Sequence, residues 1–231
     1  MTERRVELGV IVPTLNAATS LSNSLTQFEA ARASGLVTEI VVSDGGSRDE
    51  SVTMAQTAGA IIVTGPPGRG GQLALGAQAA QGDWLLFLHA DTRLDPGWEA
   101  AVTAFIAEKG EGHAAAFAFA LDDEAPAARR LERMVAWRCR WLALPYGDQG
   151  LLISRKLYDE LGGFRPMPMM EDVDLVRRIG RKRLTMLDRR AVTSAARYRR
   201  DGYLRRTARN LTCLSLYVLG VPPRLIARLY G

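Results

Sequence analysis

The sequence predicts an α/β protein in which a mostly parallel sheet is flanked by helices. Short runs rich in Val, Ile and Leu alternate with longer segments of helical period up to residue 88. Continuous apolar runs are typical of strands buried on both faces, and strand-helix alternation produces right-handed crossovers between parallel strands. The chain has 231 residues, 47% of them hydrophobic and 24% charged, so it can form one core, which excludes disorder and fibrous repeats.

The predicted strands of the first half each lead into a polar loop. They are residues 8–12, 39–43, 60–63 and 84–88, with helices at residues 17–33, 49–58 and 72–80. Pro13 lacks a backbone N–H, so we expect the first strand to end before it. Parallel sheets bind ligands beyond the carboxyl ends of their strands, so the loops after these strands are the expected site.

The second half is less regular. We expect helices from Asp95 to residue 107 and at residues 124–144 and 171–179, and strands at residues 114–121 and 150–154. The elements suggest a domain at residues 1–190, followed by a basic helical tail at residues 191–231.

Positive charge is concentrated in that tail. The formal net charge is +5, and residues 191–231 contain eight Arg and one acidic residue, Asp201. No recognition motif accompanies the basic segment, so we expect no nucleic acid partner. We expect Cys139 and Cys213 to be reduced thiols in a cytoplasmic protein, because residues 1–7 show no signal-peptide pattern and no apolar stretch reaches the length of a membrane span.

The first two loops combine turns with polar side chains. Asn16 follows the first strand and either faces the ligand crevice or caps the next helix. Asp44 ends the second strand before Gly45, Gly46 and Ser47; the glycines allow a tight turn, and the carboxylate can accept hydrogen bonds from a base or ribose. A plain turn with Ser47 as a helix cap explains the glycines and the serine, but Asp44 less naturally.

The third and fourth loops suit phosphate and a cation. Residues 65–72 place Arg69 among glycines before a helix, where N–H groups and a guanidinium can converge on phosphate, although the loop fits neither the P-loop nor the dinucleotide fingerprint. Asp91 follows the fourth strand, where a divalent cation is the usual compensation for a carboxylate, and His89 is a possible second ligand. The alternative is a turn cap at Asp91 beside a satisfied core imidazole.

A fifth element, Glu171 and Asp172, opens the helix at residues 171–179. These carboxylates either complement the helix dipole, or one of them deprotonates an alcohol at the edge of the substrate crevice. Spacing alone does not choose between these roles.

In this order, the elements resemble glycosyltransferase family 2, whose members have the GT-A fold and transfer sugars with inversion. The resemblance covers residues 10 to about 179, and implies a nucleotide-binding half at about residues 6–95 and an acceptor half at about residues 96–190. No Q-x-x-R-W, the signature of processive polysaccharide synthases, follows the acidic pair, so transfer of a single sugar is expected.

The resemblance also implies roles for individual residues. The donor nucleotide sugar would be bound by Pro13, Thr14, Asn16, Asp44, Gly45, Ser47, Arg69 and Gly70. The acceptor pocket would be lined by Gly147, Asp148 and Gln149. Asp91 would hold the metal that bridges the diphosphate, and Asp172, beside Glu171, would be the catalytic base.

One position departs from the family pattern. The metal motif usually carries a further carboxylate two positions before the residue matched by Asp91, and this chain has His89 there. Fewer negative charges weaken Mg²⁺ binding, whereas an imidazole suits Mn²⁺, so the expected cofactor is a divalent metal, Mn²⁺ or Mg²⁺. The whole chain is most similar to a small bacterial subgroup with this His-Ala-Asp variant and a basic tail.

The expected reaction is a single in-line displacement at the anomeric carbon of a nucleoside-diphosphate sugar by a hydroxyl of a small-molecule or lipid acceptor. Two alternatives remain. A nucleotide-sugar or lipid-binding module with little catalysis is compatible with the missing metal carboxylate. A nucleotidyltransferase of related fold is disfavoured, because no Gly-rich basic loop follows the first strand.

The tail predicts a helix at residues 203–219. Its apolar stripe, at spacings of three or four, is Leu204, Ala208, Leu211, Leu214 or Ser215, and Val218. Arg197 or Arg199 would fold back onto the diphosphate, or the basic helix would lie on an anionic membrane at its inner face. The third interpretation is an ordinary amphipathic helix that packs on the domain and exposes its arginines.

Overall fold

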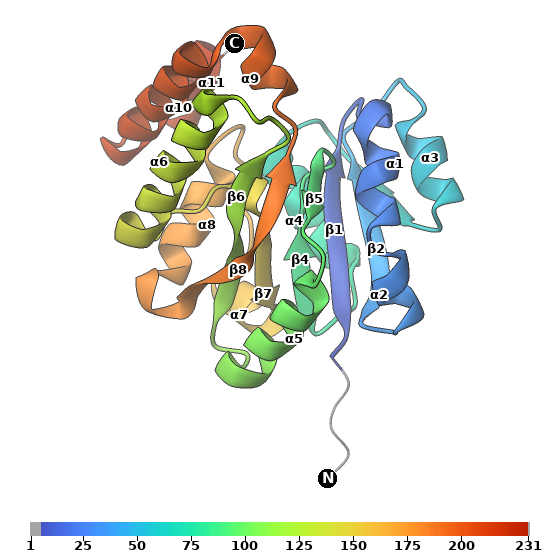
Figure 1. Ribbon diagram of the computed structural model, residues 1–231. Coiled ribbons are helices and arrows are strands. Elements are labelled where there is room, and N and C mark those ends of the chain that lie inside the picture. Colours follow the sequence, from blue (N-terminus) through green and yellow to red (C-terminus); the bar gives the residue numbers. More distant parts are fainter. Residues whose placement is uncertain (1–5, 231) are drawn as a thin grey trace.

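An eight-stranded mixed sheet forms the centre of the molecule, with helices on both of its faces (Figure 1). Its strands lie in the order β3 (Ile61–Thr64), β2 (Val37–Asp44), β1 (Leu8–Thr14), β4 (Trp84–Phe87), β7 (Leu151–Ser154), β6 (Ala114–Leu121), β8 (Leu184–Thr193) and β5 (Thr92–Leu94). β7 and β5 run antiparallel to their neighbours, and the other pairs are parallel. The computed structural model describes residues 6–230; residues 1–5 of the predicted domain and residue 231 of the predicted tail lie outside that part.

The helices form three groups around the sheet. One face is covered by α1 (Ala18–Thr26), α2 (Glu29–Ala33), α3 (Ser51–Thr57) and α5 (Trp98–Lys109). The other is covered by α4 (Arg69–Ala79), α7 (Arg155–Glu160) and α8 (Glu171–Ile179). The third group, at the upper left of Figure 1, is α6 (Pro126–Leu142), α9 (Ala196–Asp201), α10 (Tyr203–Val218) and α11 (Pro223–Tyr230). Two short 3-10 turns are η1 (Gly147–Gln149) and η2 (Arg181–Arg183).

Alternate residues of the central strands supply the two sides of the core. Val10 and Leu86 pack under the helices of the first face, whereas Ile11 and Leu85 pack under those of the second. This is the arrangement predicted from strands that are apolar on both sides, and the α/β fold class is confirmed. No helix among the described residues is both long enough and apolar enough to cross a lipid bilayer.

Two predictions about the first half are wrong in detail. Pro13 does not end β1, because its register with β2 continues to the pair Thr14 and Asp44; proline removes only its own N–H from the ladder. The helix predicted at residues 17–33 is two helices, α1 and α2. Phe28 lies at the break, fully buried, with its ring edge-to-face against Trp98 at 5.6 Å.

In the second half, β5, α7, β8, α9 and α11 were not predicted. β8 ends at Thr193, three residues inside the predicted tail, and its Thr193 hydroxyl meets that of Thr92 in β5 at 3.1 Å. The start of the tail is therefore part of the sheet.

Candidate active site

The loop after β2 is closed by the carboxylate of Asp44. Its Oδ2 accepts hydrogen bonds from the Gly46 and Ser47 amides (2.8 and 2.9 Å), and its Oδ1 accepts one from the Ser47 hydroxyl. Asp44 is 1% exposed, so it shapes the turn from inside. Ser47 is not a helix cap, because α3 begins at Ser51, whose amide and hydroxyl donate to Asp49.

Asn16 joins the loops after β1 and β2. Its backbone N–H donates to the Ser47 hydroxyl (2.9 Å), and its side-chain Oδ1 accepts a hydrogen bond from the Arg48 backbone amide (2.8 Å). Its φ of 49° is in the left-handed region, which Asn tolerates better than most residues. Asn16 does not cap α1, whose N-cap residue is Ala17. The two loops therefore form one unit.

A buried glutamine connects the first three loops. Gln72 Nε2 donates to the carbonyls of Thr14 (2.7 Å) and Ser43 (2.9 Å), and its Oε1 accepts from the Gly68 amide (3.3 Å). A Cβ on Gly45 would stand 3.0 Å from this amide group, so the loop at Gly45 packs closely against it. Because Gln72 is 5% exposed, losing these bonds would leave polar groups buried without partners.

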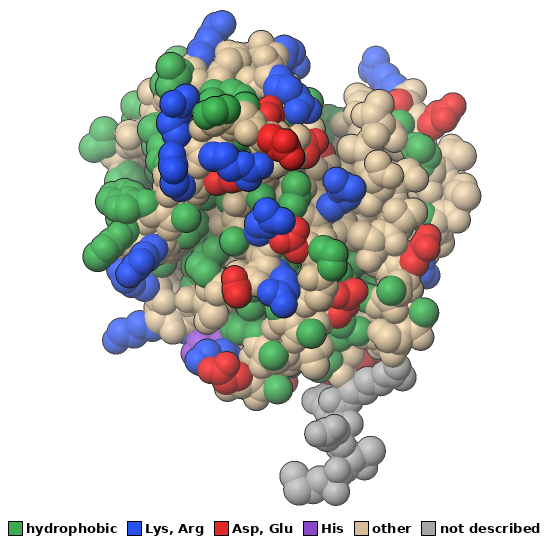
Figure 2. All heavy atoms as spheres, viewed as in Figure 1, with side chains coloured by type: hydrophobic (Ala, Val, Ile, Leu, Met, Phe, Trp, Pro, Cys, Tyr) green, Lys and Arg blue, Asp and Glu red, His purple; other side chains and the backbone are tan. Residues whose placement is uncertain are grey.

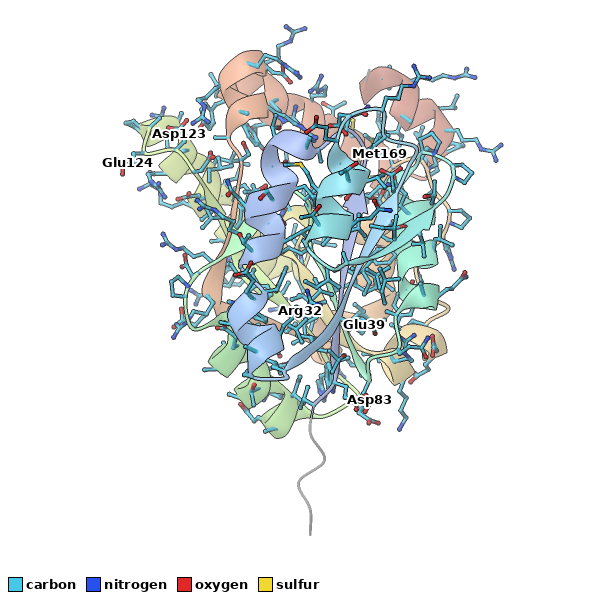
Figure 3. The ribbon with its side chains drawn as sticks, turned by 90° about the vertical axis from the view of Figure 1, so that its right-hand side faces the viewer. Arg32, Glu39, Asp83, Asp123, Glu124 and Met169 are labelled. Atoms are coloured by element: carbon cyan, nitrogen blue, oxygen red, sulfur yellow. The ribbon has the colours of Figure 1, made fainter. Side chains whose placement is uncertain are left out.

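The acidic pair lies at the carboxyl ends of the parallel strands. Figure 3 shows Met169, just before the pair, towards the upper end of the molecule, and Asp83, just before β4, at the lower end. Met170 has a φ of 66°, which a bulky residue rarely adopts, and α8 begins directly after it. This turn presents Glu171 and Asp172 at the start of the helix.

Asp172 is held by a loop distant in the sequence. Its Oδ2 accepts a hydrogen bond from the Gly147 amide (2.7 Å), and its Oδ1 accepts one from the Val173 amide (2.7 Å). A Cβ on Gly147 would stand 2.8 Å from Nε2 of His89 and 3.4 Å from Oδ2 of Asp172. The loop after β4, the η1 turn and the start of α8 therefore meet at Gly147.

Glu171 is a buried acid beside an arginine. Burial raises its pKa to about 7; the neighbouring Asp172 charge also raises it, and Arg69 opposes both. Arg69 Nε lies 3.7 Å from Glu171 Oε1, too far for a hydrogen bond, and Oε1 has no hydrogen-bond partner among the described residues. At neutral pH this carboxyl group is partly protonated.

Asp148 is a second perturbed acid in the same region. Burial raises its pKa to about 6; Arg138 opposes this, and the charges of Asp172 and Asp91 add to it. Its Oδ1 is buried and has no hydrogen-bond partner among the described residues. Asp148 therefore lies within the electrostatic reach of both the expected base and the expected metal ligand.

Two predicted binding residues have internal packing roles. Gln149 is 1% exposed; its Nε2 donates to the Phe117 carbonyl (2.9 Å) and its Oε1 accepts from the Tyr146 amide (3.2 Å). A Cβ on Gly70 would stand only 2.4 Å from the Arg165 carbonyl. The Gln149 side chain therefore holds the η1 turn against β6. The absence of a side chain at Gly70 allows α4 to pack closely against the segment that leads into α8.

Asp91, between β4 and β5, has an available oxygen. Its Oδ1 accepts a long hydrogen bond from the Thr193 hydroxyl (3.4 Å), and within residues 6–230 no group donates to its Oδ2. In the same range, no three His, Cys, Asp or Glu side chains lie close enough to hold a metal by themselves. A cation at Asp91 would therefore need further ligands, such as water or the phosphate oxygens of a bound substrate, as divalent metals in phosphate sites commonly have.

The two tail arginines lie differently. Burial lowers the pKa of His89 well below its ordinary value, and the charges of Arg69 and Arg197 lower it further, so Arg197 acts on the site. Arg199 instead forms an ion pair with Asp123 (3.5 Å).

One pocket, of about 410 Å³ including its open mouth, brings some of these groups together, but Asn16, Asp44 and Asp91 are not among its lining residues. Its polar wall consists of Arg69, His89, Gly147, Glu171 and Asp172. Its apolar lining includes Leu73, Phe87, Leu88, Leu151, Phe164 and Val176. Four of the expected loops, separated by up to about a hundred residues of chain, thus contribute to a single cavity of the size that binds small ligands.

The sequence matches the family model described as Glycosyl transferase family 2 over residues 9–171. The chain belongs to glycosyl transferase family 2. The match runs from β1 to the first residue of α8 and includes the loops that carry Asp44, Arg69, Asp91 and Gly147. Membership of family 2 makes the protein a glycosyltransferase.

Solved structures of the same fold include glucosyl-3-phosphoglycerate synthase from Mycobacterium tuberculosis. Its complex with Mn²⁺, UDP and glucosyl-3-phosphoglycerate has a TM-score of 0.59 and 22% identity, over 82% of this family 2 chain and 70% of that one. Its complex with Mn²⁺, UDP-glucose and phosphoglyceric acid has a TM-score of 0.58 and 23% identity, over 78% and 69%. At this identity the similarity shows the GT-A fold. Among curated proteins, no significant match to this chain is found.

Three residues of this family 2 site were not predicted. Gln72 ends the Gly-rich loop at residues 65–72, but no role was predicted for its side chain. Tyr146 lines the pocket with the Arg138 guanidinium 3.5 Å from its ring centre. Thr193 reaches Asp91 from β8, about a hundred residues away, and no local pattern indicates that contact.

Proposed function

We propose that the protein transfers a single sugar from a nucleoside-diphosphate sugar to an acceptor hydroxyl, with inversion at the anomeric carbon. The observation that carries the proposal is the pocket in which Asp172 meets Arg69, His89 and Gly147. A carboxylate base and a wall suited to phosphate line the same cavity, which is what one displacement requires. A single displacement inverts the reacting carbon.

Asp172 is the proposed general base. Its carboxylate lines the pocket, and the Gly147 amide fixes Oδ2. It would take the proton of the acceptor hydroxyl as the oxygen attacks the anomeric carbon and the diphosphate leaves from the opposite face. Glu171, buried against Arg69 and partly protonated at neutral pH, would position that guanidinium.

Arg69 and Arg197 are the proposed partners of the departing diphosphate. Arg69 begins α4, where free backbone N–H groups also favour phosphate, and its side chain is 45% exposed. Arg197 is exposed and close enough to depress the pKa of His89. Arg199, which is engaged with Asp123, is a weaker candidate for the same role.

Asp91 and His89 are the proposed ligands of a divalent metal. The pair fits a cation shared with substrate, because Asp91 keeps a free oxygen and the described residues form no closed protein cage. One carboxylate with an imidazole suits Mn²⁺ better than Mg²⁺, and residues 89–91 form the His-Ala-Asp variant. When bound, the metal would neutralise charge that develops on the diphosphate.

The loops after β1 and β2 are the proposed nucleoside site. They would contact the donor through Pro13, Asn16 and Ser47, while the buried Thr14, Asp44 and Gly45 would hold the backbone of the site in place. The internal hydrogen bonds of Asp44 and Gln72 hold this backbone in place before a ligand arrives. The mycobacterial enzyme binds UDP-glucose and Mn²⁺ on the same fold, which supports a nucleotide sugar here. Gly147 and Asp148 are the proposed acceptor contacts.

A turnover assay tests the proposal. The protein is incubated with Mn²⁺, UDP- or GDP-sugars and a panel of hydroxyl acceptors, and nucleoside diphosphate release and the anomeric configuration of the product are measured. We expect turnover with at least one pair, an inverted product, and a loss of about 10² to 10⁴ in kcat for Asp172→Asn. Donor binding without turnover across the panel would favour a binding module, and a retained configuration would exclude the single displacement.

A further inference from the structure

Helix α10 exposes the apolar stripe that an ordinary amphipathic helix would bury. Leu204 is 88% exposed, Leu211 43% and Val218 57%, and Leu219, at the end of the helix, is 80% exposed. The sequence predicted Leu204, Leu211 and Val218 on one helical face, and the structure directs these side chains into solvent. Several large apolar side chains together on a surface indicate a site of interaction.

The opposite face of α10 holds the polar contacts with the domain. Arg206 is 7% exposed and pairs with Asp201 (2.8 Å), with its guanidinium 5.3 Å from the ring centre of Tyr198. Cys213 is 2% exposed, and the Tyr217 hydroxyl reaches Asp174 of α8 (3.5 Å). These contacts fix the helix with its apolar stripe outward.

Two neighbouring helices extend the exposed apolar surface. On α6, Trp137, Trp141 and Leu142 are 59%, 55% and 53% exposed, and on α11, Leu225 and Leu229 are 48% and 64% exposed. Met134, one turn before Trp137, lines a pocket of about 340 Å³ together with Leu211, which places α6 directly beside α10. The exposed apolar residues of these three helices form one surface, which we call the tail face: Trp137, Trp141, Leu142, Leu204, Leu211, Val218, Leu219, Leu225 and Leu229.

The tail face is surrounded by positive charge. Exposed arginines on the same three helices are Arg130, Arg133, Arg140, Arg205, Arg224 and Arg228. Within residues 6–230 none of them has an ion-pair partner, and no Asp or Glu occurs after Asp201. Figure 2 shows hydrophobic and Lys or Arg side chains together over the region where Figure 1 places α6 and α10.

We propose that the tail face docks on the surface of an anionic lipid bilayer. Leu side chains would enter the boundary between headgroups and acyl chains, Trp137 and Trp141 would lie at the interface, and the arginines would contact lipid phosphates. A second copy of the chain is a poorer occupant, because a two-fold contact would bring two sets of unpaired arginines together. Leu211 also lines the pocket that reaches Asp148, so the docked surface adjoins the proposed acceptor loop.

Vesicle flotation tests the proposal without any substrate. The full chain is floated with phosphatidylcholine vesicles, and with vesicles in which about one third of the lipid is phosphatidylglycerol. Test variants are Trp137→Ala with Trp141→Ala, and Arg224→Gln with Arg228→Gln. Matched controls are Ile61→Ala, an exposed apolar residue on β3, and Arg93→Gln, an exposed cation on β5. Thermal unfolding of each variant checks that the fold is retained.

We expect strong flotation with the anionic vesicles alone, weakening at high salt, with about a fivefold loss of partitioning for each Arg removed. The Trp variant should lose partitioning by tenfold or more, and the controls should behave as wild type. Tryptophan emission should shift to the blue with anionic vesicles, because Trp137 and Trp141 are exposed while Trp84 and Trp98 are buried.

Three results would overturn the proposal. These are no flotation of the wild-type chain, equal flotation of a folded Trp variant, and equal binding to neutral and anionic vesicles. If sedimentation shows a dimer that the Trp substitutions dissociate, a second copy covers the tail face instead.

Discussion

The amide of Gly147 donates a 2.7 Å hydrogen bond to Oδ2 of Asp172. Twenty-five residues of chain separate the two, and the contact joins the η1 turn to the first turn of α8. It leaves the proposed base with a fixed orientation at the pocket wall, because its Oδ1 is also held, by the Val173 amide. The space around Gly147 is therefore critical to the site.

Gly147→Ala should lower activity far more than stability. Its Cβ would stand 2.8 Å from the His89 ring nitrogen, so either the imidazole or the Gly147 backbone, whose amide holds Asp172, must shift, whereas Asp172 Oδ2 at 3.4 Å is only in van der Waals contact. We expect kcat to fall at least about tenfold, since small misplacements of catalytic groups are costly. The unfolding free energy should change by about 1 kcal/mol, because the displaced atoms are side-chain ends. Gly112→Ala, whose Cβ would meet nothing within 4 Å, is the control. Unchanged kcat in Gly147→Ala would remove this turn from the site.

Gln72→Ala should weaken both folding and donor binding. The substitution removes an amide that bonds the carbonyls of Thr14 and Ser43, and leaves those acceptors buried. We expect a loss of about 1–3 kcal/mol in unfolding free energy, measured by urea titration, and weaker donor binding by calorimetry. Gln78→Ala, on the exposed side of the same helix, should alter neither. If the two variants have the same donor affinity, the hydrogen bonds from Gln72 to the Thr14 and Ser43 carbonyls do not shape the donor site.

The stability of the protein should depend on pH through Glu171. Its pKa is about 7 in the folded state against 4.5 as the ordinary value, so the fold favours the protonated acid. The contribution of this carboxyl group to the unfolding free energy is fully present below about pH 4.5 and is lost as the pH rises through 7. Glu171→Gln cannot ionise, and should therefore exceed wild type at pH 8 by about 1–3 kcal/mol while differing little at pH 5.

Denaturant unfolding at pH 5 and pH 8 measures this difference. Glu124→Gln, at an exposed acid labelled in Figure 3, is the control and should show no such pH dependence. A Glu171→Gln effect of equal size at both pH values would show that ionisation of this carboxyl group is not responsible.

Continuous apolar runs predicted the central strands well because these strands are buried on both faces. β8 was not predicted because a bulge interrupts its two-residue alternation. Phe117 of β6 pairs with Leu187 and Ala118 with Arg190, so Asp188 and Arg189 lie in the bulge between these pairs. β5 has only three residues, too few for a pattern. The helical stripe of α10 was predicted, but helical period alone does not say whether a face meets the core or solvent.

The loops at Arg69 and His89 and the acidic start of α8 were predicted from their own residues, whereas the loop at Gly147 was predicted only through the family resemblance. The sequence could not show that the Asp44 carboxylate accepts its hydrogen bonds from the amides of its own turn. It also could not show that the Gln149 side-chain amide donates to the Phe117 carbonyl. Both depend on backbone atoms brought near by folding. The same holds for Arg197 and Arg199, which are two residues apart yet face different partners.

Donor binding with and without Mn²⁺, compared between Asp91→Asn and Asp172→Asn, tests the central claim most directly. We expect calorimetry to show Mn²⁺-dependent binding of a UDP- or GDP-sugar to wild type, loss of that dependence in Asp91→Asn, and near-normal binding in Asp172→Asn with turnover abolished. Binding that ignores Mn²⁺ and is equal in Asp91→Asn and wild type, or near-normal turnover in Asp172→Asn, would contradict the account.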